Sequence, residues 1–176
     1  MASIVLIVFA FLVLCNTAFS DDKRNDEKTQ SHLLQEILLL NKQISKISYV
    51  NKKSRNILKK TKNKYSYEIY LSFANIYKTF LWCSDLSHWL SQTYNNKNNM
   101  NSHIYARIIA NKKSIKKTLG YVDKIYKHIN NVNLLHIIDT QEKIIGVGLD
   151  QLDKIIFYLK KFEEQKTRKK SVPKLK

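Results

Sequence analysis

Apolar residues recur along most of this chain at alternating steps of four and three residues, the spacing of a helix buried along one side. In the first row this spacing holds for five positions: Leu33, Ile37, Leu40, Ile44 and Ile47. We therefore predict a helix that begins near Thr29 or Ser31. The row fades at Asn51 and Ser54 before Leu58, so the stretch that follows is either a solvated continuation of the helix or a connector.

A second helix is predicted over residues 65–94. Its apolar row has the same steps, with a polar gap at Ser87: Ile69, Phe73, Ile76, Phe80, Cys83 and Leu90. Trp82, Leu86 and Trp89 form a second line beside this row, which predicts a wide apolar face. Because aromatic side chains bury large areas, we expect this helix to be the best buried of all.

A third helix is expected after the Asn-rich loop 95–101, with Ser102 as its N-cap. Its apolar row comprises seven positions: Ile104, Ile108, Ile115, Leu119, Val122, Tyr126 and Ile129. The segment 130–133 then interrupts the pattern, and a short apolar piece runs from Leu134 to Ile138.

A fourth helix is predicted to start at Asp139, because Asp139 and Glu142 have the spacing of a capping box. Its apolar row is Ile145, Leu149, Leu152, Ile156 and Leu159. Gly146 and Gly148 lie in its first turns, where glycine is costly for a helix. They predict a close approach of a neighbouring element.

Four amphipathic helices joined by polar loops predict an all-α fold, either an elongated four-helix bundle or two packed helical hairpins. The chain of 176 residues contains only three Gly and one Pro, which argues against a turn-rich β fold. We expect the helical domain to span residues 21–165 and a basic, disordered tail to span residues 166–176.

The first twenty residues differ from the rest of the chain. Residues 2–15 are almost entirely apolar, a length too short to span a bilayer comfortably, and Ala18 and Ser20 supply the small residues that a signal peptidase recognises. We interpret residues 1–20 as a cleaved signal peptide. The expected location of the protein is therefore secreted or periplasmic.

Candidate catalytic chemistry is sparse. Cys83 and His88 are five residues apart, which places them about 140° apart around a helix, so they cannot pair locally. None of the five histidines lies three or four residues from another His or Cys, so no helical metal-ligand pair is predicted. We predict that the chain is not an enzyme and that it holds no cofactor and no metal.

The chain carries a formal net charge of +17, and residues 42–64 hold nine Lys or Arg and no acid. Such a surface attracts anionic membranes as well as nucleic acid. Most of the basic residues are lysines, and export removes most nucleic-acid partners, so no specific nucleic acid and no small-molecule substrate is predicted. A protein partner or self-assembly is expected, and an anionic membrane surface is the second candidate partner.

Aromatic side chains of the second helix are the candidate interaction or pocket residues: Tyr70, Phe73, Tyr77, Phe80, Trp82 and Trp89. An aromatic row at helical spacing more often forms a core than a ligand pocket. A bundle that carries a small apolar ligand between these side chains is the alternative.

The start of the predicted fourth helix resembles a known group of proteins. Asn133 and Leu134, followed by residues 139–144 (Asp-Thr-Gln-Glu-Lys-Ile), are similar to the last helix start of exported helical conjugal transfer proteins of type IV secretion systems. Asp139, Glu142 and Lys143 match the cap, acid and base of that pattern, while Thr140 departs from it. The resemblance implies an assembly factor with a helical fold and no catalytic site.

Three functional hypotheses follow from the sequence, and the third is the helical carrier of a small apolar ligand described above. The first is an exported, non-enzymatic interaction or assembly protein, such as a component of a conjugal transfer or secretion apparatus. The second is a secreted effector, or a salivary-type protein of a parasite or insect, that acts on a host partner or membrane.

Overall fold

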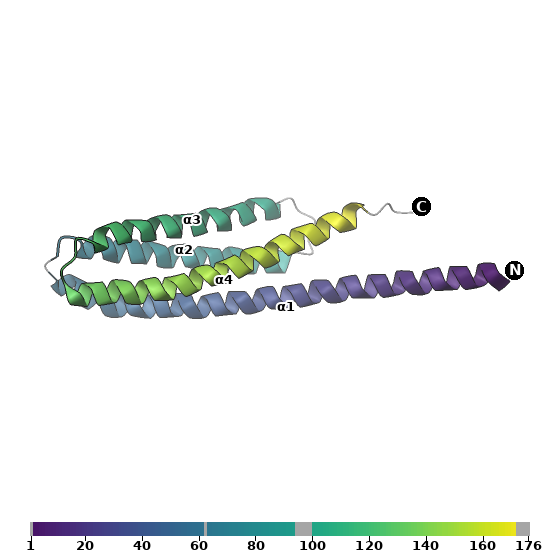
Figure 1. The fold of residues 1–176 in the computed structure, drawn as a ribbon, viewed down its shortest axis with the longest axis horizontal. Helices are drawn as coiled ribbons and strands as arrows, with labels where there is room; N and C mark the ends of the chain where they lie inside the picture. The colour runs from purple at the N-terminus through teal and green to yellow at the C-terminus, as the bar shows by residue number, and fades with distance from the viewer. Residues whose placement is uncertain (1, 62, 94–99, 172–176) are drawn as a thin grey trace.

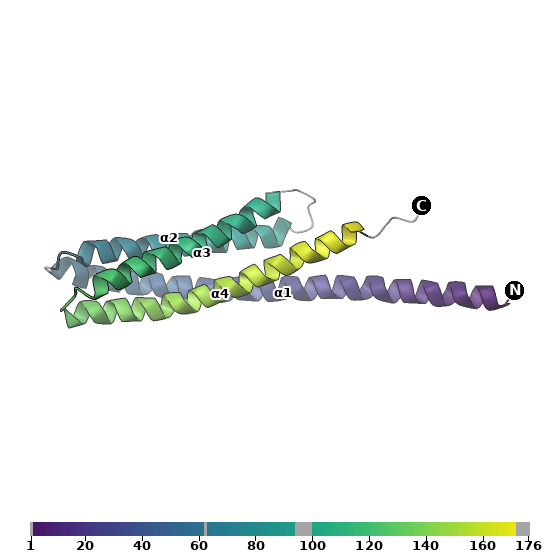
Figure 2. The ribbon, with the colours of Figure 1, turned by 45° about the horizontal axis from the view of Figure 1, so that its top comes forward.

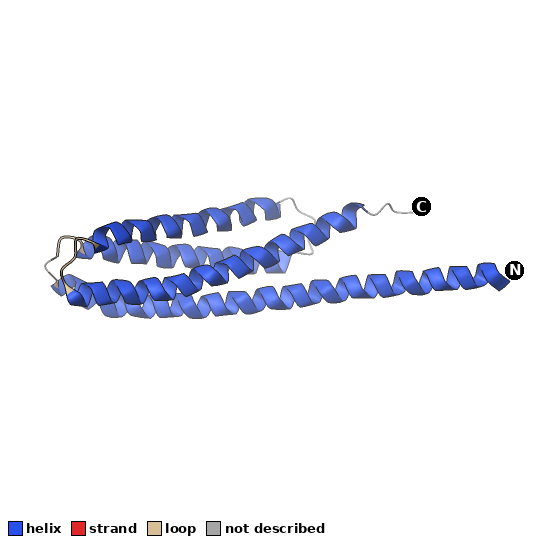
Figure 3. Cartoon of the chain, viewed as in Figure 1, coloured by secondary structure: helices blue, strands red, loops and turns tan. Residues whose placement is uncertain are grey.

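The computed structural model of this chain contains four helices, and the residues that it describes form no strand (Figure 1; Figure 3). The helices are α1 (Ala2–Lys60), α2 (Ser66–Thr93), α3 (Met100–Tyr126) and α4 (Val132–Ser171). The structure describes the backbone of residues 2–61, 63–93 and 100–171, and the side chains of residues 27–61, 63–93 and 102–164. The prediction of an all-α fold is confirmed.

Consecutive helices run antiparallel and form an elongated four-helix bundle (Figures 1 and 2). α1 packs against both α2 and α4, while α3 packs chiefly against α2 and more lightly against α4. The N-terminal part of α1 extends beyond the other three helices (Figure 1). The seam between α3 and α4 is therefore the weaker side of the bundle.

The core consists of the apolar rows that the sequence predicts. All five positions of the first row are buried, as are the six named positions of the α2 row. In α3 the row is buried at Ile108, Ile115 and Val122, and Ile129 is buried just beyond the helix end. In α4 every position of the row is buried except Ile156, which is half-buried. Because each row repeats at helical spacing, one side of each helix meets the others along its length.

The first row does not end at Asn51 and Ser54. Ser54 and Leu58 are buried, and α1 continues to Lys60, so the basic stretch after residue 42 is mostly helix. Asn51 forms a polar junction in place of an apolar contact. Its side-chain amide nitrogen donates to the backbone carbonyl of Phe73 across 3.3 Å, and its oxygen accepts from the side chain of Gln141 across 2.6 Å.

The predicted starts of α1, α3 and α4 were wrong. α1 contains residues well before Thr29, because no Gly or Pro in that region interrupts the helix. α3 begins at Met100, so Ser102 lies inside the helix rather than at its cap. Of the predicted loop 95–101, residues 95–99 lie outside the described residues.

The start of α4 lies seven residues earlier than the capping-box spacing indicated. The side-chain oxygen of Asn131 accepts a hydrogen bond from the backbone N–H of Leu134 across 3.0 Å, and its backbone carbonyl accepts from Leu135 N–H. Asn131 is thus the N-cap, and Asp139 lies inside α4. The capping-box spacing failed here because the same residue spacing also occurs within a helix.

The prediction of close approach holds for one of the two glycines. A Cβ atom added to Gly148 would lie 2.9 Å from Cζ of Phe80, whereas one added to Gly146 would meet nothing within 4 Å. Gly148 therefore lets the Phe80 ring approach the α4 backbone.

The ends of the chain leave two predictions open. The side chains of the proposed signal peptide, residues 1–20, lie outside the described residues. The predicted basic tail overlaps the end of α4, which runs to Ser171, and residues 172–176 lie outside the described part of the chain.

Candidate functional site

Two tryptophans are exposed on the outer face of α2. The exposed fraction is 61% for Trp82 and 38% for Trp89, and Leu86 between them is half-buried. The predicted wide apolar face is therefore wrong at both tryptophans. Trp82 follows the buried Phe80 by two residues, which turns it about 200° around the helix and away from the core.

The spacing of this row is itself helical. Trp82, Leu86 and Trp89 stand at positions i, i+4 and i+7, so they lie above one another on a single side of α2. Leu71, which is 40% exposed, precedes Trp82 by about three helical turns and therefore lies on the same outer side of α2. We call Trp82, Leu86 and Trp89 the tryptophan row.

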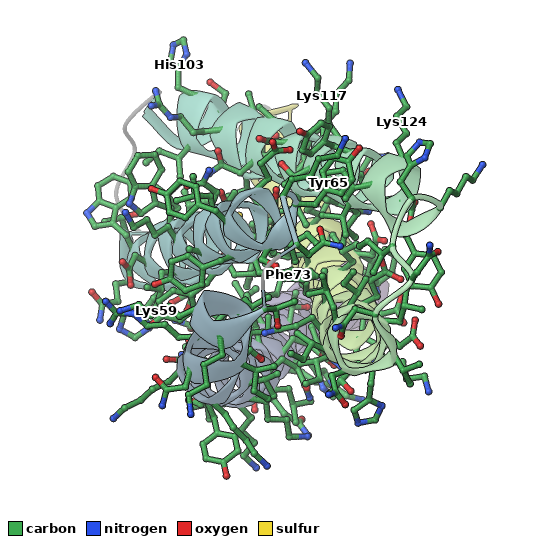
Figure 4. All side chains as sticks on the ribbon, turned by 90° about the vertical axis from the view of Figure 1, so that its left-hand side faces the viewer. Lys59, Tyr65, Phe73, His103, Lys117 and Lys124 are labelled. Carbon is green, nitrogen blue, oxygen red and sulfur yellow. The ribbon has the colours of Figure 1, made fainter. Side chains whose placement is uncertain are left out.

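The other four candidate aromatic residues lie elsewhere. Phe73 and Phe80 are fully buried in the core, and Tyr70 and Tyr77 are half-buried against it. Figure 4 shows Phe73 in the middle of the bundle when it is viewed along its length. The structure thus separates the six predicted residues into a core group and an exposed group.

Charge is distributed unevenly over the helices. α2 contains one lysine, Lys78, and two carboxylates, Glu68 and Asp85, although the whole chain carries +17. By contrast, α3 contains six Lys or Arg and one acid. Figure 4 shows Lys117 and Lys124 pointing away from the bundle on the side of α3, as does His103. The tryptophan row therefore lies on the helix with the fewest basic side chains.

Cys83 is enclosed in the core. It is 0% exposed, and burial raises the pKa of its thiol to about 12, a shift that the nearby Asn111 side chain only partly opposes. A thiol with such a pKa stays protonated at neutral pH and is a poor nucleophile. His88 is exposed on another side of α2, where its ring lies 2.9 Å from the side-chain nitrogen of Gln92.

The histidines do not gather in the part of the chain whose side chains are described. His32 stacks on Tyr158, with ring centroids 5.7 Å apart, and His128 lies beside Tyr65 at the opposite end of the bundle. Within these residues there is no group of three His, Cys, Asp or Glu that would hold a metal ion.

Three carboxylates meet at the seam between α3 and α4. The pKa of Glu142 is raised from 4.5 to about 7, chiefly because the carboxyl group is buried. The negative charge of Asp123, a hydrogen bond with Asp123 and the negative charge of Asp139 raise it further. The oxygen Oε1 of Glu142 is buried without a hydrogen-bond partner among the described residues. Tyr126 adds to this group, because Asp139 accepts a hydrogen bond from its hydroxyl, and burial and this bond raise the pKa of Tyr126.

Sequence reasoning placed the tryptophans beside the core and did not identify the carboxylate cluster. The positions of Trp82 and Trp89 could have been found by measuring their angle from Phe80 rather than their step along the row. The meeting of Asp123 with Glu142 depends on how α3 and α4 align, which no local pattern encodes.

Among the described side chains, no helix is long and apolar enough to cross a membrane. Comparison with known proteins adds no family: no family model, curated protein or solved structure matches this chain.

Proposed function

We propose that this chain is an exported, non-enzymatic interaction protein that binds another protein through the tryptophan row on the outer face of α2. The observation that carries the proposal is the exposure of Trp82 and Trp89 on one side of a single helix. Isolated apolar residues are common on protein surfaces, but two tryptophans and a leucine in one row form a larger apolar patch.

Charge favours a protein as the partner on this face. The centres of protein interfaces are poor in charged residues and rich in tryptophan, which often carries much of the binding energy. α2 has this composition, with a single lysine in 28 residues. An anionic membrane would be attracted more strongly to the lysine-rich surface of α3 than to this helix.

The geometry of the row fits a helical or groove-shaped partner. Side chains at i, i+4 and i+7 are the anchors that a helix offers to a complementary groove or to a second helix. The partner is therefore expected to present an apolar surface along the length of α2. A second copy of this chain satisfies that description as well as a different protein does.

A second function is supported by the outer face of α3. Lys117 and Lys124 point outward there (Figure 4), and a cluster of lysines on one helix attracts anionic lipid. A secreted effector that acts at a membrane surface would use this face. It would not require the tryptophan row.

The resemblance to conjugal transfer proteins would place the partner in a type IV secretion apparatus. The residues that carry it, Asn133, Leu134 and residues 139–144, lie inside α4 and take no part in the tryptophan row. The proposed binding face therefore stands without that assignment.

Photo-crosslinking in the producing cells tests the proposal. A photoreactive phenylalanine analogue is placed at Trp82 in one variant and at Trp89 in another. The matched control carries it at Phe157, which is 53% exposed on α4. Crosslinked products are identified by mass spectrometry.

We expect one dominant protein product from positions 82 and 89 that is absent from position 157. Substituting Leu86→Lys should remove that product, because a charged side chain would stand in the middle of the row. The same products from all three positions, or none from positions 82 and 89, would contradict a binding face on α2.

A further inference from the structure

A groove of about 480 Å³ lies at the end of the bundle where α1 turns into α2. Figure 4 views this end, with Lys59 extending outward from the last turn of α1. Arg55, Leu58 and Lys59 of α1 line the groove, together with Tyr67 and Tyr70 of α2. Its volume is within the range of small-molecule sites in proteins.

The two cations that α1 contributes to the groove are not neutralised. Arg55 and Lys59 are one helical turn apart and exposed, and no ion pair among the described residues involves either of them. The stretch 42–64 contains no acid. The nearest carboxylate in α2, Glu68, accepts a hydrogen bond from the hydroxyl of Tyr121 on α3 across 2.6 Å.

The turn that shapes the groove is held by its own hydrogen bonds. The hydroxyl of Thr61 donates to the carbonyl of Ile57 across 2.8 Å, and the side-chain oxygen of Asn63 accepts from the backbone N–H of Tyr65 across 2.9 Å. These polar groups are occupied. By contrast, the hydroxyls of Tyr67 and Tyr70, two residues that also line the groove, have no hydrogen-bond partner among the described residues.

The start of α2 adds to the positive potential. Ser66, the first residue of this helix of 28 residues, also lines the groove. The backbone N–H of Ser66 already donates to the carbonyl of Asn63 across 3.1 Å. The start of α2 therefore contributes to the groove through the partial positive charge of the helix dipole, which favours anions. Two side-chain cations, two phenol donors and a helix start thus surround one space.

We propose that this groove binds a phosphate ester, with the phosphate group against Arg55 and Lys59 and the organic part against Tyr67 and Leu58. A guanidinium and an ammonium one turn apart match the spread charge of a phosphate better than the single charge of a carboxylate. The exposed Tyr67 ring and the apolar Leu58 side chain supply contact for an aromatic or acyl group. This site lies at the turn between α1 and α2 and is separate from the tryptophan row.

Nuclear magnetic resonance titration of the purified, isotope-labelled chain, with its N-terminus established by mass spectrometry, tests this site. The probes are phenyl phosphate, inorganic phosphate and benzoate. We expect phenyl phosphate to give saturable shifts at residues 55–70 with a dissociation constant on the order of 1 mM or below. Inorganic phosphate should bind more weakly at the same residues, and benzoate weakest.

Variants separate this site from general attraction to a basic protein. The double substitution Arg55→Gln with Lys59→Gln should weaken phenyl phosphate binding about tenfold or more. The matched control, Lys42→Gln with Lys46→Gln, removes the same charge from two exposed positions of α1 outside the groove and should leave the affinity unchanged. Tyr67→Leu should weaken phenyl phosphate binding more than it weakens inorganic phosphate binding, because it removes the ring that contacts the organic part.

Vesicles identify the source of the phosphate. If the ligand is a lipid headgroup, vesicles containing phosphatidic acid bind the chain, and the Arg55/Lys59 variant loses this binding while the Lys42/Lys46 control on α1 keeps it. If the ligand is a soluble ester, phenyl phosphate binds and vesicles shift no groove residue. Equal losses in the two variants, or shifts spread over the lysines of α3 without saturation, would overturn the proposal.

Discussion

The side chain of Gln141 donates from Nε2 to Oδ1 of Asn51 across 2.6 Å, and this bond joins α4 to α1 inside the bundle. Asn51 donates in turn to the carbonyl of Phe73 on α2. One polar side chain therefore connects three helices at a single level. Gln141 is 0% exposed, whereas Asn51 is half-buried.

The two ends of this bond should respond unequally to mutation. Asn51→Ala leaves the amide of Gln141 buried without its acceptor, so the free energy of unfolding should fall by about 1–3 kcal/mol. Gln141→Met should change it by less than about 1 kcal/mol, since it removes a buried amide whose Oε1 has no partner among the described residues. Urea unfolding measures both, and a larger loss in Gln141→Met would contradict the junction.

The two glycines of α4 provide a matched pair. Gly148→Ala should destabilise the protein by about 1–2 kcal/mol, because the added Cβ would press on the Phe80 ring and the enclosed ring has little room to move. Gly146→Ala should stabilise it by up to about 1 kcal/mol through better helix propensity. Thermal unfolding compares them, and Phe80→Leu should relieve the cost of Gly148→Ala. An equal effect of the two substitutions is incompatible with the close contact.

Glu142 should make stability depend on pH. Its folded-state pKa is raised from 4.5 to about 7 by burial and by Asp123 and Asp139, so the folded state holds this proton more tightly than the unfolded chain does. The stability contributed by protonated Glu142 is therefore fully present below pH 4.5 and is lost as the pH rises through about 7. Ionisation of Glu142 should loosen the seam between α3 and α4.

The pH dependence of the melting temperature measures this effect. Glu142→Gln should reduce the fall in melting temperature between pH 4.5 and about 7. Asp150→Asn, a change at an exposed position of the same helix, should leave that fall unchanged. If the pH dependence of the melting temperature is unchanged in Glu142→Gln, groups other than Glu142 produce it.

Cys83 should react with alkylating reagents only when the bundle opens. It is fully enclosed, and burial raises its thiol pKa to about 12, so little thiolate is present and the reagent has no access. Modification of the peptide containing Cys83, followed by mass spectrometry, should be slow in buffer and fast in urea. Rapid labelling of the folded chain would mean that this part of the core is open.

The core could be predicted because each buried row repeats along one helix. Leu33, Ile37 and Leu40 need no partner information to be recognised as buried, since the spacing alone aligns them. The start of α4 carried a usable local signal as well. Asn131 stands three residues before Leu134 in an Asn-rich stretch, which is the position of an N-cap, but Asp139 and Glu142 presented a stronger pattern inside the helix.

Other features could not be derived from local patterns. Asn51 and Gln141 are 90 residues apart along the chain, so their bond depends on the alignment of α1 with α4. The carboxylates of Asp123 and Glu142 meet for the same kind of reason. At the tryptophan row, adjacency to the core row was mistaken for burial, although Trp82 lies on nearly the opposite side of α2 from Phe80.

Acrylamide quenching of tryptophan fluorescence tests the central claim, an exposed row on α2 that is free to bind a protein. Trp89→Phe leaves Trp82 as the only tryptophan, and Trp82→Phe leaves Trp89. Light scattering establishes the oligomeric state of each sample. We predict that both tryptophans are quenched in the monomer, with Trp82 quenched more readily than Trp89, and that both are protected in a dimer or in a complex with the crosslinked partner. Tryptophans that are already shielded in the monomer would contradict the account.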